Sequence, residues 1–391
     1  MNSYIVSYLR TPFGRFGKSL APFSPSDLGA AVIKELVKKK SLNPSQIDMV
    51  IMGNVLKSGH GQDLTRQAII KAGLPDTIDG YVVDMVCSSS MMSVINGAQM
   101  TALGDADLVI AGGMESMSNA AFCINSSIRQ GVKFLMKNNL NIVDTMYYDG
   151  LTDPMNNMVM GAEADRVAKE QNITKGQLDE IALLSHTRAA KATDDGVFSK
   201  CMVPIKLQDG TTLSTDEGIR KNITAEKIAS LAPVFGKEGL HTAASSSQIT
   251  DGASAMILTN EKGMKEYGLE PEARILGYSW AATESWRFTQ APSFAIDRLI
   301  KKLKVKKEDI DYVENNEAFA VSSILMERYG FKREFTNIYG GAIAIGHPIG
   351  ASGSRIIGTL ITALKTKNGK IGIASLCHGT GGATAVAIEL L

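Results

Sequence analysis

Two neighbouring residues that can move protons, Cys377 and His378, occupy a turn made almost wholly of small residues, "SLCHGTGG" at 375–382. Thiol and imidazole groups both change charge not far from neutral pH, so either side chain is a candidate acid or base. The alternative is a tight turn after a buried strand, in which the Cys is only a small hydrophobic residue. The turn alone leaves both interpretations open.

A second candidate is Cys87, which opens "CSSSMM" directly after the apolar segment "YVVDMV". The pattern predicts a strand that leads into a helix, with Cys87 at the first turn. Free backbone N–H groups and the positive end of the helix dipole favour a thiolate there, and thiolate is the nucleophilic form of a thiol whose free pKa is about 8.5. A cysteine packed at the end of a strand is an equally good interpretation of this turn.

A third candidate is His347, in the small-residue segment "NIYGGAIAIGHPIGASGSR" at 337–355. No Gly-Lys-Ser/Thr follows, and the spacing is not GxGxxG after a strand, which argues against a phosphate loop. Pro348 restricts the backbone beside the histidine. We expect an imidazole held in one orientation, able to polarise a thiol or donate to an oxyanion; the alternative is a hydrogen-bonded core histidine.

The elements that position these residues occur twice. Segments 25–54 and 292–316 each have Pro-Ser, an amphipathic helix ending in lysines, the dipeptide Ile-Asp and a strand. Segments 81–113 and 343–382 also share the order of their elements. The offset between Ile47 and Ile310 brings Cys87 opposite Gly350, three residues after His347. The pattern predicts an α/β protein of two similar halves, with helices on both sheet faces and a shared site.

The segment between the halves, about 119–248, follows a different pattern. It is rich in Met and Asn at 149–164, and a helix is predicted at 174–193 with Thr174 as its N-cap. We expect an insertion that covers a site.

Composition narrows the class of protein. The chain has 391 residues, 44% hydrophobic and 21% charged, with a formal net charge of +1, so nothing in the total favours nucleic acid or an anionic membrane as a partner. The four cysteines are too scattered for a disulfide framework, and the sequence has no CxxC or HExxH metal motif, so no metal is expected. No apolar run is long enough to cross a bilayer and no targeting segment is recognised, so we expect a cytoplasmic protein.

Taken together, "VCSSSMMSV", "NNEAFA", "GGAIAIGHPIGASGSR" and "CHGTGG" resemble the thiolases, acyltransferases that make or cleave 3-ketoacyl-CoA, and the resemblance runs nearly end to end. It implies a thiolase fold: two repeated βαβαβαββ halves in a layered α/β/α/β/α core with an inserted loop domain. The implied division is an N-terminal half at 1–118, a loop domain covering the CoA site at 119–248, a return to the first half at 249–268 and a C-terminal half at 269–391. A homodimer or homotetramer is also implied.

The same resemblance assigns roles to single residues. Cys87 matches the nucleophile, His347 the residue that activates it, and Cys377 the second, acid/base cysteine. Asn316 matches the residue that holds a water in one oxyanion hole, to which His347 also donates. The backbone N–H groups of Cys87 and Gly379 match the other hole. The substrate and CoA contacts implied are Arg220, Ser247, Met160 and Phe319.

The predicted function is therefore that of an acetyl-CoA acetyltransferase, which condenses two acetyl-CoA reversibly to acetoacetyl-CoA and CoA through an acyl-cysteine. CoA thioesters are the expected substrates, and no permanently bound cofactor is expected. The alternatives are a degradative thiolase of longer chains, a decarboxylating ketoacyl synthase and a non-catalytic acyl-CoA-binding protein. Cys377 stands where a ketoacyl synthase places a histidine, which argues against the synthase alternative.

Three departures from the family pattern concern the acyl pocket. Val159 replaces a common His, Ser90 replaces a common Gly, and the segment 285–292 has no Met-Gly-rich character. We expect Trp286 and Phe288 of that segment to close the end of the pocket and to favour short acyl chains.

Overall fold

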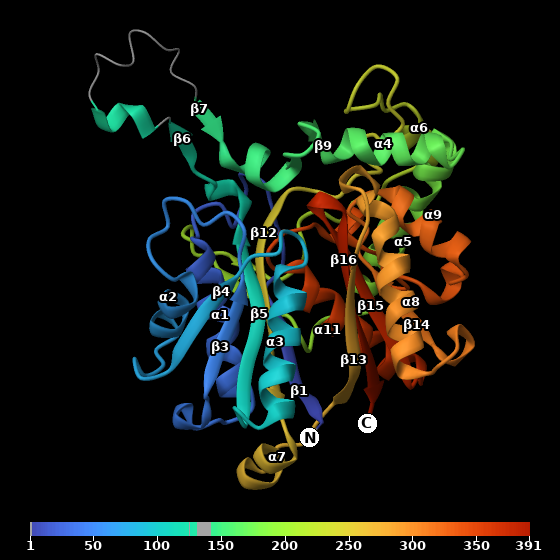
Figure 1. Ribbon diagram of the computed structural model, residues 1–391. Coiled ribbons are helices and arrows are strands. Elements are labelled where there is room, and N and C mark those ends of the chain that lie inside the picture. The colour runs from blue at the N-terminus through green and yellow to red at the C-terminus, as the bar shows by residue number, and fades with distance from the viewer. Residues whose placement is uncertain (1, 125, 131–141) are drawn as a thin grey trace.

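A computed structural model describes residues 2–124, 126–130 and 142–391 of the chain. One large mixed sheet runs through the molecule (Figure 1). Its order is β14-β15-β16-β13-β1-β12-β5-β3-β4, and the short β2 (Gly14–Arg15) pairs with β12. The N-terminal half contributes β1 (Ser3–Arg10), β3 (Met49–Gly53), β4 (Asp79–Val83), β5 (Leu108–Ser116) and β12 (Thr250–Thr259). The C-terminal half contributes β13 (Ala273–Ala282), β14 (Tyr312–Asn315), β15 (Ile371–His378) and β16 (Gly382–Leu390).

The strand order reveals the duplication that the sequence predicts. The halves meet where Ser3–Ile5 of β1 pairs antiparallel with Ala273–Ile275 of β13. Outward from this junction, each half has two antiparallel neighbours and then a parallel pair, β5 with β3 on one side and β15 with β14 on the other. The halves differ at the edge: the place of β4 is taken in the C-terminal half by a single parallel bridge between Val313 and Thr336.

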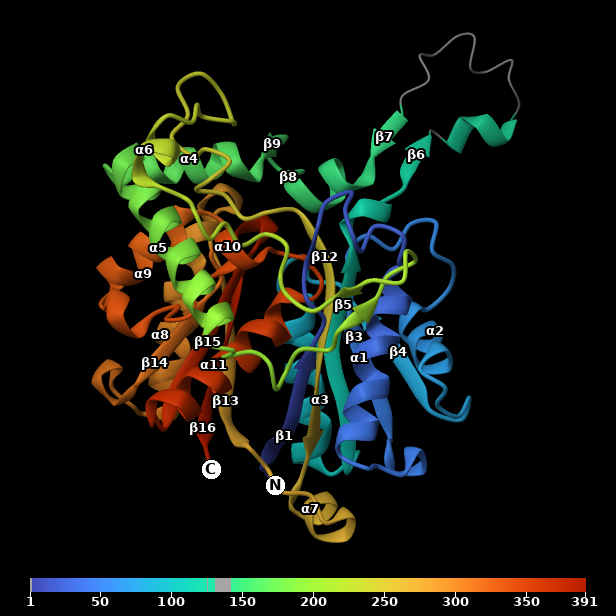
Figure 2. The same cartoon turned by 180° about the vertical axis from the view of Figure 1, so that it is seen from behind.

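Helices cover both faces of each half (Figures 1 and 2). Those of the N-terminal half are α1 (Pro25–Lys39), α2 (Leu64–Lys71), α3 (Ser89–Leu103) and α7 (Glu261–Tyr267); those of the C-terminal half are α8 (Ala291–Leu303), α9 (Ala320–Tyr329), α10 (Ala342–Ile345) and α11 (Ser352–Lys367). Helices α3 and α11 contact each other and the strands around them in the middle of the molecule. A Cβ at Gly353 would overlap the backbone of Met91, so glycine permits this close approach.

Local sequence accounts for the helix ends. Ser24 and Asp27 form a capping box at the start of α1, Pro25 occupies the first turn, and Lys38 and Lys39 lie in the last turn. Helix α5 (Lys175–Asp194) begins after Thr174 as predicted, and Gln177 completes its capping box.

Of the described residues between β5 and β12, those at 142–170 lie over one end of the sheet, whereas α5 runs alongside the C-terminal half (Figures 1 and 2). Their helices, besides α5, are α4 (Met160–Glu170) and α6 (Ala225–Ala229), and a π-helical turn, η5, spans Met146–Gly150. Their paired strands are β6 (Phe122–Ile124) with β7 (Ile142–Asp144), β8 (Thr152–Asp153) with β9 (Met158–Val159), and β10 (Ile205–Lys206) with β11 (Thr212–Leu213). In the described residues no helix combines the length and apolarity needed to cross a membrane.

Candidate active site

Cys87 lies in the tight turn between β4 and α3, two residues before the helix begins, and is buried. Val86, directly before it, has φ +49°, which a β-branched residue rarely adopts. The hydroxyl of Ser89 donates to the Val86 carbonyl at 2.5 Å and accepts from the Met85 N–H at 2.9 Å. The first turn of α3 thus holds the strained turn that presents the thiol.

The environment of Cys87 keeps the thiol neutral. Burial raises its pKa to about 12, although hydrogen bonds from the backbone N–H groups of Gly379 and of Cys87 itself act in the opposite direction. The sequence-based expectation that a helix start favours thiolate is therefore outweighed by desolvation. A nucleophilic Cys87 needs a base that removes its proton during attack.

His347 follows α10 and precedes α11, and its imidazole has a defined proton arrangement. Nδ1 lies 2.6 Å from the hydroxyl of Ser352, which itself donates to the Pro348 carbonyl at 3.0 Å. Because a serine hydroxyl has one proton to donate, Nδ1 of His347 is the donor in the first contact. Burial, with the charge of Arg355, lowers the imidazole pKa to about 3. His347 is therefore a neutral acceptor at Nε2.

Asn316 faces that nitrogen. Its Nδ2 lies 3.4 Å from Nε2 of His347, and both side chains are buried. Asn316 follows β14 directly, and its backbone N–H donates to the carbonyl of Ser375 in β15. The structure brings together two predicted residues from segments about thirty positions apart.

Cys377 lies near the end of β15 and is also buried. Burial raises the pKa of its thiol, and negative charge on Cys87 raises it further, so the two sulfurs are electrostatic neighbours. Its neighbour His378 is engaged differently. Nδ1 of His378 donates to the carbonyl of Gly379 at 2.7 Å, within the turn itself.

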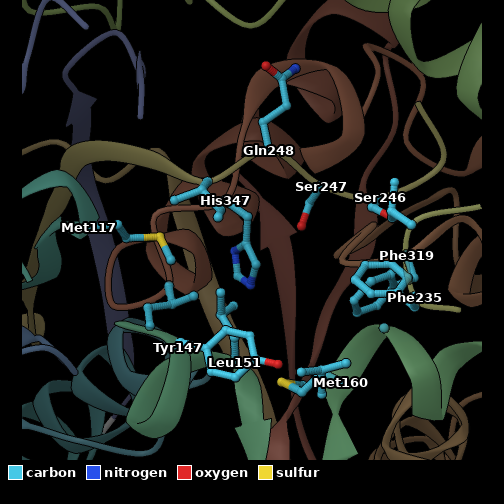
Figure 3. A pocket seen from close by; sticks show the side chains of 15 residues that line it. Met117, Tyr147, Leu151, Met160, Phe235, Ser246, Ser247, Gln248, Phe319 and His347 are labelled. Carbon is cyan, nitrogen blue, oxygen red and sulfur yellow. The ribbon is translucent and has the colours of Figure 1, made fainter. Parts of the chain in front are cut away.

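A cavity of about 430 Å³ opens beside His347. Four predicted residues line it: His347, Met160, Ser247 and Phe319. Figure 3 shows the imidazole pointing into the cavity, with Met117 on one side and Ser247 on the other. Val159, one of the departures from the family pattern, is part of the wall. Tyr147 and Leu151 also line it, and no sequence pattern marks either residue, because both lie in an irregular segment.

The segment 285–292 lies behind this wall and does not form it. Phe288 is fully buried with its ring against that of Phe319 at 6.0 Å, and Trp286 stacks under the guanidinium of Arg166 at 3.7 Å. Neither Trp286 nor Phe288 lines the cavity. The expectation that they close its end is thus wrong, since the cation–π contact draws Trp286 onto α4 while Phe288 supports Phe319 from the far side.

The third departure, Ser90, has a structural reason. Its hydroxyl accepts the backbone N–H of Ser354 at 3.1 Å. That N–H belongs to the first turn of α11, where no carbonyl of the same helix can accept it. Ser90 therefore joins the two central helices behind Cys87.

Arg220 lies apart from the other predicted residues. It lines a separate hollow of about 400 Å³ together with Arg15 and Lys227, whereas the cavity beside His347 does not include it. Three positive side chains make this hollow suited to an anionic group. In the described part of the chain, no cluster of three or more His, Cys, Asp or Glu side chains forms a metal-binding group.

Comparison with known proteins agrees with this arrangement. The profile of the thiolase N-terminal domain matches residues 3–262, and that of the thiolase C-terminal domain matches residues 269–390. An acetyl-CoA acetyltransferase of Synechocystis is 49% identical over 99% of this chain and 98% of its own. The crystal structure of the Bacillus anthracis acetyl-CoA acetyltransferase superposes with a TM-score of 0.96 at 37% identity, covering 100% of this chain and 99% of the other.

A thiolase from Ascaris suum, solved in complex with coenzyme A, superposes with a TM-score of 0.93 at 37% identity and full coverage of both chains. Two family profiles thus span nearly the whole sequence, and the relatives match over their full lengths. This chain belongs to the thiolase family of acyltransferases.

Proposed function

We propose that the protein is an acetyl-CoA acetyltransferase that condenses two acetyl-CoA reversibly to acetoacetyl-CoA and CoA. The observation that carries this proposal is the neutral imidazole of His347, which points into a largely apolar cavity and whose Nε2 carries no proton and can accept one. The buried thiols of Cys87 and Cys377 have raised pKa values and need such an acceptor or an equivalent one. The names of the full-length relatives support the same activity.

In the first half-reaction, Cys87 attacks the thioester carbonyl of acetyl-CoA while Nε2 of His347 takes its proton. The backbone N–H groups of Cys87 and Gly379 stabilise the oxyanion. Support for that hole comes from the backbone N–H groups of Gly379 and Cys87, which act to lower the pKa of the Cys87 thiol. When the adduct collapses, the bond to the CoA sulfur breaks, this sulfur takes the proton from His347, and acetyl-Cys87 remains.

In the second half-reaction, Cys377 passes its proton to Nε2 of His347, and the thiolate that results removes an α-proton from a second acetyl-CoA. With Cys87 acylated, no negative charge can form on its sulfur to raise the pKa of Cys377 further. His347, now protonated at Nε2, and a water held by Asn316 stabilise the enolate oxygen. The enolate carbon bonds to the acetyl carbon, the bond to Cys87 breaks, and the Cys87 sulfur takes the proton from Nε2 of His347, while Cys377 keeps the α-proton.

The CoA arm is proposed to run from the cavity at His347 to the hollow at Arg220. Ser247, Met160 and Phe319 would contact the acyl group and pantetheine, because they line the cavity. Arg220, Arg15 and Lys227 would receive the phosphates of the nucleotide. Residues 119–248 would act as the loop domain over this path, and the assembly would be a homodimer or homotetramer.

Mass spectrometry of the acylated enzyme tests the proposal. Incubation with acetyl-CoA should add one acetyl group to the peptide that contains Cys87, and acetoacetyl-CoA with free CoA should be consumed. Cys87→Ser should abolish both. The matched control is Cys201→Ser, because Cys201 is another buried free cysteine, whose sulfur donates to the Phe198 carbonyl and which does not line the cavity beside His347. Turnover by the Cys87→Ser variant, or acetylation elsewhere, would refute the assignment.

A further inference from the structure

A buried arginine lies behind the proposed enolate site. Arg355 is the fourth residue of α11 and is 1% exposed. Its terminal nitrogen donates to Oδ1 of Asn316 at 3.3 Å. A guanidinium has donors and no acceptor, so the Asn316 atom that it contacts must be the oxygen.

This contact determines which end of the Asn316 amide faces the site. The oxygen and nitrogen ends of a carboxamide have nearly the same shape, so only hydrogen-bond partners distinguish the two orientations. With Oδ1 held by Arg355, Nδ2 faces Nε2 of His347 at 3.4 Å. The opposite orientation would place two lone pairs, those of Oδ1 and Nε2, against each other and an N–H against a cation.

The orientation also decides what the amide can bind. An Asn316 whose oxygen is occupied presents only N–H donors toward the cavity side. Donors are what an enolate oxygen, or a water that supports it, requires. The opposite orientation would present an acceptor to developing negative charge.

The charge of Arg355 also acts on His347, whose pKa it lowers. Among the described residues no carboxylate lies within ion-pair distance of its guanidinium, and the nearby Glu314 has no hydrogen-bond partner on either oxygen. Burial raises the pKa of Glu314 to about 8, so that carboxyl is largely neutral at pH 7. Burial lowers the pKa of the Arg355 guanidinium, and among the described residues no ion pair offsets this behind Asn316 and His347.

We propose that Arg355 is a positioning residue for carbon–carbon bond formation: it fixes the Asn316 amide with its N–H groups toward His347 and the enolate. The inference rests on the proposed function and adds a residue to it. Acylation of Cys87 uses the other oxyanion hole and does not need this orientation. Loss of Arg355 should therefore separate the two half-reactions.

The test compares Arg355→Met with Glu314→Gln, a matched control that changes a neighbouring buried polar group whose side-chain oxygens form no hydrogen bond to Asn316. Acetylation of Cys87 is followed by intact mass, and enolate formation by deuterium exchange into the methyl group of acetyl-CoA. In Arg355→Met, acetylation should stay within about tenfold of wild type, while exchange and condensation fall about 100-fold, the lower bound for losing one oxyanion donor. Glu314→Gln should retain both.

A double-mutant cycle with Asn316→Ala gives the sharper result. If Arg355 acts through Asn316, Arg355→Met in the Asn316→Ala background should lower exchange by less than about threefold, since coupled residues are not additive. Unchanged exchange in Arg355→Met, or a full additional 100-fold loss in the double variant, would overturn the inference.

Arg355→Lys gives the same information should the methionine variant fail to fold, because it keeps a buried positive charge while its shorter side chain and point-like ammonium lose the guanidinium contact to Oδ1 of Asn316. Reduced exchange with acetylation retained supports the inference, and equal effects on both overturn it. Wild-type enzyme that does not cleave acetoacetyl-CoA refutes the proposed function itself. Wild-type enzyme that does so, together with an Arg355→Met variant that exchanges normally, refutes only the role of Arg355.

Discussion

Replacing each member of the Cys377–His378 pair separately should show which one carries the proton. In Cys377→Ala, acetylation of Cys87 should persist, whereas condensation should fall by about 10²–10⁴-fold, the usual effect of losing a general base. At about 1.4 kcal/mol per tenfold, that corresponds to roughly 3 to 5.5 kcal/mol of transition-state stabilisation.

For His378→Ala the magnitude follows from the side-chain hydrogen bond that the substitution removes. The Nδ1 donor of His378 supports the Gly379 carbonyl, the peptide group that follows the proposed oxyanion donor. A neutral hydrogen bond contributes about 0.5–1.5 kcal/mol, so its loss should lower the rate by at most about tenfold. The two variants should therefore differ by at least one order of magnitude in condensation.

The assay measures acyl-enzyme yield by intact mass beside steady-state condensation and thiolysis for both variants. Cys377→Ala should give a normal yield of acetyl-enzyme with little acetoacetyl-CoA, and His378→Ala should give both products. The assignment is wrong if His378→Ala is the more damaging change, or if Cys377→Ala condenses acetyl-CoA at nearly the wild-type rate.

Three other predictions concern ionisation, stability and specificity. Because the pKa of Cys87 is raised to about 12, its thiolate fraction should rise about tenfold per pH unit from pH 7 to 9. The rate of its modification by iodoacetamide, measured by peptide mass, should rise in parallel, and a plateau near pH 8 would contradict this. Asp216→Asn should lower the free energy of unfolding by about 3–5 kcal/mol in urea titrations, since it leaves Arg10 buried without its bidentate partner, and the double variant Arg10→Met/Asp216→Leu should recover part of the loss. Acetoacetyl-CoA should be cleaved with a higher kcat/KM than 3-ketooctanoyl-CoA, because Phe288 packs behind Phe319 and keeps this wall of the cavity from moving to admit a longer acyl chain. The opposite order of kcat/KM would show that the wall moves.

Much of the fold could be predicted from sequence because it depends on local patterns. Helical periodicity, lysines in last turns and capping residues such as Ser24 and Thr174 act within a few residues, and the structure confirms the helices they predict. The repeated order of elements likewise predicted that the turns of Cys87 and His347 would meet. Ser354, close to the second turn, indeed donates to Ser90, close to the first. The residue types and their order sufficed to recognise the family.

The tertiary structure alone decided the protonation and orientation of these groups. The helix start at Cys87 predicted a thiolate, but burial by residues distant in sequence outweighs the local N–H groups and raises the thiol pKa. The tautomer of His347 depends on Ser352, and the orientation of Asn316 depends on Arg355. Desolvation depends on how many atoms surround a group, and hydrogen-bond direction depends on which partners lie beside it. A single sequence shows which groups are present, and only packing determines which of them surround a given sulfur, nitrogen or amide.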